Sequence, residues 1–174
     1  MSSSLTVYEA IDWYDANGYP TDTASMDAYF DTNNVTFFDS IGLFQPPIQK
    51  WLDNYGPLGS SVKFGALVVF NLTIPVAGEY QFAVEGDAIW DAFMDDALIV
   101  SNYEPLDFPG ELDVYSSSVS LSEGSHILQV RFVNGITASG YGVWCKLPGV
   151  NSWEPLPLEL YSGITPNVGF SSGA

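Results

Sequence analysis

The sequence predicts an all-β protein, an antiparallel β-sandwich of the jelly-roll kind with long ordered loops. From Val62 onward apolar residues recur with period two and turn residues follow at short intervals, a pattern typical of antiparallel sandwiches and barrels. The 174 residues fit one domain, and 47% apolar residues with 15% aromatics supply one large core. We therefore expect a single sandwich domain over residues 1–161 and an extended C-terminal arm over residues 162–174.

Alternation predicts a first pair of strands at residues 63–74 and 79–84. The segment from Pro75 to Gly78 between them is made of turn-compatible residues, so the two strands form a hairpin-like pair. One face of the first strand is apolar along its whole length and should point into the core. Its residues are Phe64, Ala66, Val68, Phe70, Leu72 and Ile74.

A second pair is predicted at residues 119–121 and 125–133, joined by the turn from Ser122 to Gly124. His126 shares the apolar face of the later strand with Leu128, Val130 and Phe132. Alternation over residues 141–147 places Cys145 on an apolar face, as a buried thiol. The first sixty residues mix aspartates with aromatics, so we expect short strands and long ordered loops there, and a last strand near residues 156–161.

The charge balance excludes two classes of partner. There are 21 acidic residues against 4 basic ones, a formal charge of -17 at pH 7. Nucleic acids and anionic membrane surfaces are bound by clustered Lys and Arg, which this chain lacks. The acidic surface leaves two interpretations open: it keeps the protein hydrated, or it gathers carboxylates that bind cations.

The sequence contains no recognisable export or membrane segment. Residues Met1 to Ser4 lack the basic and apolar regions of a secretory leader. No apolar stretch approaches the ~18 residues that span a bilayer, so membrane insertion is not expected. A location on a virion or an extracellular surface would then require another route of delivery.

Two blocks resemble the protective-antigen-type (PA-fourteen) domain family. Residues 78–100 match its central pattern, which is G-x-Y-x-F, an aspartate pair, an apolar strand, an Asp-Gly turn and another apolar strand. Residues 121–135 are similar to the later L-x-x-G-x-H-x-I-x-[IV]-x-[FY]-x-N-G strand. Trp144 with residues 147–149 resembles the closing W-x-x-P-G with a one-residue offset. The resemblance covers about residues 63–161.

The resemblance implies a β-sandwich of the kind found in bacterial toxins, glycosidases and yeast adhesins, one that often binds sugars. In the adhesins a calcium ion is held by the aspartate pair, and here that pair is Asp87-Ala88. A hard cation takes about six to eight oxygen ligands, so the alanine removes both charge and geometry. The positions left for a calcium ion are Asp87 and Asn134, and the alternative is that Asp87 caps its loop.

Binding is predicted at residues 85–91, interpreted as a loop. Trp90 lies between Asp87 and Asp91, and sugars are held by aromatic rings that stack on C–H faces while carboxylates take the hydroxyls. The alternative is that Trp90 turns inward as a core residue. The ligand-binding candidates are therefore Asp87, Trp90 and Asp91.

Catalysis is not expected. Ser-His-acid chemistry needs an imidazole, and the one histidine, His126, falls on the core-facing side as a hydrogen-bonded structural residue. Glycosidase chemistry needs only two carboxylates, so the sequence leaves it open, but no pair lies in a recognisable frame.

These features predict a non-enzymatic surface module. Our main hypothesis is a virion or phage structural protein, such as a decoration, spike or fibre protein, that contacts protein neighbours and presents a glycan-binding loop. The motivation is a stand-alone module of a usually secreted family without leader or anchor. The alternative is a lectin-like, carbohydrate-binding adhesion module of a cell-surface or secreted system.

Overall fold

The computed structural model describes residues 4–9, 16–32, 34–40, 64–107, 111–134, 141–157 and 160. One helix, α2 (Thr23–Thr32), lies between the first two strands. No helix in these ranges has the length and hydropathy that a bilayer crossing requires. The strands are β1 (Ser4–Glu9), β2 (Asn34–Ser40), β3 (Phe64–Ile74), β4 (Gly78–Met94), β5 (Ala97–Asp107), β6 (Ser116–Leu121), β7 (Gly124–Asn134), β8 (Tyr141–Lys146) and β9 (Glu154–Pro155).

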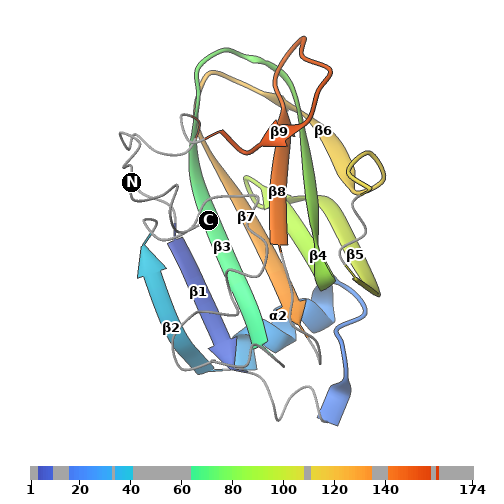
Figure 1. The fold of residues 1–174 in the computed structure, drawn as a ribbon. Helices are drawn as coiled ribbons and strands as arrows, with labels where there is room; N and C mark the ends of the chain where they lie inside the picture. The colour runs from blue at the N-terminus through green and yellow to red at the C-terminus, as the bar shows by residue number, and fades with distance from the viewer. Residues whose placement is uncertain are drawn as a thin grey trace, which may run out of the picture.

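The strands form two antiparallel layers that share β4 (Figure 1). One layer runs β2-β1-β3-β7 and continues with the second half of β4 and with β5, while the first half of β4 pairs with β6 and β8 in the other layer. The crossing lies near Gly86, because Gly86 still pairs with Tyr141 of β8, whereas Ile89 pairs with Val133 of β7. Thus β4 joins the two layers at one end of the sandwich.

The core lies between the two layers and is built from the alternating residues that the sequence predicts. Phe82 and Val130, one from each layer, are fully buried. Cys145 is buried as well, and desolvation raises the pKa of its thiol to about 12, which keeps the thiol protonated at neutral pH. The predicted all-β sandwich is confirmed. Its core also includes Ala66, Val68, Phe70, Leu72, Ile74, Tyr80, Val84, Trp90, Ala92, Met94, Leu128 and Phe132.

Helix α2 is the main departure from the sequence prediction, which expected short strands and long ordered loops in this part of the first sixty residues. The helix begins with a reciprocal cap: the Ser25 N–H donates to Asp22 Oδ1 at 2.8 Å, and the Asp22 N–H donates to Ser25 Oγ at 3.1 Å. Met26 and Tyr29 of α2 are buried in a second, smaller apolar cluster. The cap and the buried pair Met26 and Tyr29 together account for a short helix with one apolar side at this position.

α2 packs on the outer face of the larger layer, at the end where β3 begins and β7 ends (Figure 1). Gly65 of β3 permits this close approach, because a Cβ at that position would overlap the ring of Tyr29. The helix thus covers one end of a sheet face that would otherwise face water.

The C-terminal prediction needs one correction. A last strand was expected near residues 156–161, but the described strand is β9, at Glu154–Pro155, and the Leu156 N–H donates to the Val143 carbonyl at 3.0 Å. A proline at position 157 lacks the N–H that would continue the ladder. The predicted arm over residues 162–174 lies outside the described residues.

Candidate functional site

The end of the sandwich where β4 crosses between layers brings together several polar residues of the predicted site. Asp87 of β4 pairs with Asp107 of β5, and Asn134 ends β7 opposite Phe64 of β3. β7 pairs with β4 up to Val133 and Ile89, so Asp87 and Asn134 lie just beyond the same end of one ladder. We call this end, defined by Asp87, Asp107 and Asn134, the rim. The structure describes the backbones of these three residues and not their side chains.

The predicted loop at residues 85–91 is wrong, because all of these residues belong to strand β4. The crossing is short, and β4 resumes pairing on both sides by Trp90, which lies opposite Phe132 of β7 and Asn102 of β5. Trp90 and Asp91 are therefore fully buried residues of a central strand. Trp90 points into the core, edge-on to Tyr115 with ring centroids 5.3 Å apart, so it offers no stacking face to solvent. Their role in ligand binding stays a prediction.

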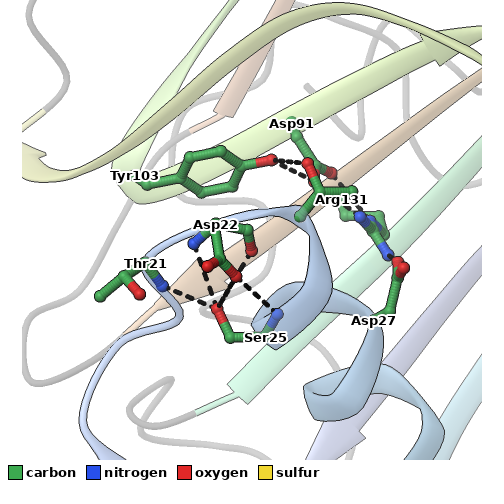
Figure 2. Close-up of polar contacts among 8 residues, drawn as sticks. Thr21, Asp22, Ser25, Asp27, Asp91, Tyr103 and Arg131 are labelled. Atoms are coloured by element: carbon green, nitrogen blue, oxygen red, sulfur yellow. Dashed lines mark hydrogen bonds and ion pairs between the residues drawn. The ribbon is translucent and has the colours of Figure 1, made fainter.

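Asp91 is instead the centre of a polar network beneath α2 (Figure 2). Arg131 of β7 binds it with two hydrogen bonds, Nε to Oδ1 at 2.8 Å and Nη2 to Oδ2 at 2.6 Å. The Tyr103 hydroxyl of β5 donates to Asp91 Oδ2 at 3.0 Å. A buried carboxylate is stable here because a planar guanidinium and a phenol occupy its lone pairs.

Two contacts tie α2 to this network. The Arg131 Nη1 donates to Asp27 Oδ1 of α2 at 2.5 Å (Figure 2). In the second contact, Thr23 Oγ1 lies 2.8 Å from the Tyr103 hydroxyl oxygen. The Arg131 guanidinium also lies over the rings of Phe93 and Phe30, 5.1 Å and 5.7 Å from their centroids. Burial, then the neighbouring Asp91 carboxylate, raises the pKa of Tyr103 to about 12, so its hydroxyl stays protonated as a donor.

Sequence reasoning did not identify this network. Alternation places Arg131 on the outward face of β7, where an arginine is normally solvated. Its side chain is only 6% exposed, because α2 covers that face. The signal that could have revealed it is the helix-start pattern of Asp22 and Ser25, followed by apolar residues at helical spacing.

One side of the sandwich carries a serine, a histidine and an aspartate in contact, as a hydrolytic triad does: His126 lies between Ser122 and Asp95. Their hydrogen bonds nevertheless assign His126 a structural role. His126 Nδ1 is 2.6 Å from Asp95 Oδ2, and Nε2 is 2.9 Å from the Ser122 carbonyl oxygen and 3.3 Å from Ser122 Oγ. Because a carbonyl oxygen only accepts, Nε2 carries a proton and has no lone pair for a serine proton. In this arrangement His126 is an imidazolium clamp and not a general base.

The clamp holds the tip of the β4–β5 hairpin against β7. Asp95 and Asp96 both have positive φ, 48° and 67°, as a tight primed turn requires. Asp95 Oδ1 also accepts from the Ile127 N–H at 2.8 Å. Desolvation opposes charge on both partners of the clamp. The Asp95 contact and the Ser122 carbonyl nevertheless raise the pKa of His126, and the His126 and Ile127 hydrogen bonds lower the pKa of Asp95.

These pKa shifts predict a pH window for the clamp. The raised pKa of His126 gives a stabilisation that is complete below the ordinary value of 6.5 and is lost as pH rises through the folded value. The lowered pKa of Asp95 gives a second stabilisation, which is present above the ordinary aspartate pKa of 3.8 and is lost in stronger acid. Between about pH 6 and about pH 9 we expect the wild type to lose about 1 kcal/mol more than His126→Gln, a value kept small because Asp95 is half exposed.

Urea unfolding of the two proteins at both pH values checks this expectation. Parallel pH profiles for the wild type and His126→Gln would contradict the clamp. Asp96→Asn, which alters the neighbouring charge without touching the imidazole, should retain the pH dependence of the wild type.

The two residues predicted to bind calcium, Asp87 and Asn134, both lie at the rim. No three His, Cys, Asp or Glu side chains in the described ranges gather as a metal-binding group. Calcium at Asp87 and Asn134 stays a prediction.

The fold is that of the PA14 domains, the protective-antigen-type sandwiches. The PA14 domain of the antifreeze protein MpAFP is similar with a TM-score of 0.67 at 10% identity, over 92% of this chain and 89% of that domain. A PA14 sugar-binding domain from an RTX adhesin gives a TM-score of 0.62 at 14% identity, over 93% and 98%.

A third similar structure is the A domain of Epithelial Adhesin 9 from Candida glabrata, in complex with Galb1-3GlcNAc. Its TM-score is 0.62 at 8% identity, over 88% of this chain and 85% of the adhesin domain. No protein-family model and no curated protein matches the sequence. The predicted resemblance is thus confirmed at the level of the fold.

Proposed function

We propose that this chain is a non-catalytic carbohydrate-binding module of an extracellular surface, with its glycan site at the rim. The observation that carries the proposal is the likeness to adhesin domains along about nine-tenths of the chain, one of them a sugar-binding domain and another in complex with a galactoside. At 8–14% identity this likeness supports the fold, so the ligand is our inference.

The rim suits a polar ligand because strand ends from both layers meet there. Asp87 and Asp107 lie opposite each other on neighbouring strands, and the crossing leaves the backbone at Gly86 and Asp87 near the end of the ladder. Carboxylates are among the polar groups that accept hydrogen bonds from sugar hydroxyls. Of the three predicted ligand residues, we assign the glycan contact to Asp87, while Trp90 and Asp91 support the strand that carries it.

The virion hypothesis gains no support from the comparisons. They favour the adhesion alternative, since the similar domains include those of an RTX adhesin and of Candida adhesins. Protein neighbours in a virion or other assembly therefore stay a prediction, and an extracellular surface is the location that we propose.

Glycan binding is tested directly with the whole chain. We expect it to bind galactosides on a glycan array that includes Galb1-3GlcNAc, Galb1-4GlcNAc and lactose, which are the ligands in similar adhesin structures. Asp87→Ala should lower the affinity for the glycan that the wild type binds by at least about tenfold, because one direct polar contact is lost. Isothermal titration gives both affinities.

The matched control is Glu123→Ala, which removes the same charge from an exposed turn at the opposite end of the sandwich. It should bind as the wild type does. Titrations in calcium and in chelator show whether an ion contributes. A wild type that retains no glycan in either buffer, or an Asp87→Ala variant of unchanged affinity, would overturn the rim assignment.

A further inference from the structure

Helix α2 is attached to the sheet at the residues that lead into the rim. Its buried Met26 and Tyr29 share an apolar cluster with Ile89 of β4 and Val133 of β7. Ile89 is two residues from Asp87, and Val133 immediately precedes Asn134. The helix therefore packs on both strands at the point where they reach the rim.

The polar contacts fix where along the sheet the helix sits. Asp27 reaches Nη1 of Arg131, whose other two nitrogens are bound to Asp91 on the adjacent strand. The three residues therefore bridge α2, β7 and β4 through charge-assisted hydrogen bonds of defined geometry. Apolar contacts alone would leave the helix free to slide, because they have no preferred direction.

We propose that α2 is a positioning element for the rim site, and that Asp27, acting through Arg131, is the residue that sets its position. This inference rests on the proposed function, and it adds a residue far from Asp87 in the sequence to the determinants of glycan affinity. Asp27 is a positioning residue and does not itself touch the ligand.

Asp27 can be removed without dismantling the sandwich. Its side chain is 57% exposed, so its loss creates no large cavity. Arg131 keeps both hydrogen bonds to Asp91, so its buried charge stays paired. A substitution at Asp27 therefore loosens the helix and leaves the central strands intact.

The test compares Asp27→Ala with Asp31→Ala. Asp31 is an exposed residue of the same helix, and its substitution by alanine removes the same charge. The carboxylates that bind Arg131 are those of Asp27 and Asp91, so Asp31 is outside the Arg131 network. We expect Asp27→Ala to lower the affinity for the galactoside that the wild type binds by about five- to tenfold, within the usual range of couplings between sites. Asp31→Ala should change this affinity less than about twofold. Asp27→Glu keeps the carboxylate and should recover most of the affinity.

Affinities are measured well below the melting temperature of each variant, so that all are fully folded, and amide hydrogen exchange of residues 23–32 is followed in parallel. Faster exchange in α2 with unchanged exchange in β7 is expected for Asp27→Ala. Equal affinities of Asp27→Ala and Asp31→Ala would overturn this inference and leave glycan binding standing. A wild type that binds none of the probes would overturn the proposed function, and the positioning role with it.

Discussion

Asp91→Ala is expected to lower the free energy of unfolding by about 3–5 kcal/mol, because it leaves the Arg131 guanidinium buried without its principal partner. The Asp91 side chain is fully buried and the Arg131 side chain is 6% exposed. The remaining carboxylate, Asp27, holds a single nitrogen and lies at the surface, where water screens it. The Tyr103 hydroxyl also loses its acceptor. Urea unfolding at neutral pH, followed by tryptophan fluorescence, measures the loss.

The control is the double variant Asp91→Ala, Arg131→Met, which removes both charges and retains an apolar side chain of similar length. It should be more stable than Asp91→Ala alone, because an unpaired buried charge destabilises more than an absent pair. A loss below about 1 kcal/mol in the single variant, or a double variant of lower stability, would show that water reaches Arg131.

The sandwich itself follows from short-range information in the sequence. Alternating apolar residues in β3 and β7 identify which face is buried, since a strand turns successive side chains to opposite sides. Phe82, Val130 and Cys145 are buried as that pattern predicts. The loop predicted at residues 85–91 was wrong because Asp87, Trp90 and Asp91 resemble surface ligands in composition. Only the pairing of β4 with β8, β5 and β7 shows that one strand continues through this segment.

The Arg131 network could not be derived from local patterns. Arg131 and Asp27 are 104 residues apart, and their contact exists only because α2 covers the outer face of β7. The periodicity of β7 correctly places Arg131 away from the core, but it contains no information about a second layer on that side. Whether a polar side chain is buried depends on which other elements pack over it, so the burial of Arg131 can be recognised only in the folded structure.

Trp90→Ala is the other substitution for which we expect a large effect, a loss of about 3–5 kcal/mol, because it empties the centre of the core. Trp90 is among the largest fully buried side chains, and it packs edge-on against Tyr115. Its Nε1–H finds no hydrogen-bond partner among the residues that the structure describes, so we attribute the stabilisation to packing and apolar burial. Trp90→Phe should therefore lose only about half as much, since it keeps an aromatic ring and removes an unpaired donor.

Trp90→Phe also separates the role of Trp90 in the core from its predicted role in ligand binding. If Trp90 acts through packing, Trp90→Phe remains folded at low temperature and binds the galactoside probes with the affinity of the wild type. If its indole stacks on the sugar, Trp90→Phe loses affinity while its melting temperature falls little. Calorimetric unfolding and glycan titration of Trp90→Phe, each set beside the wild type, decide between these outcomes, and full burial of the indole favours the first.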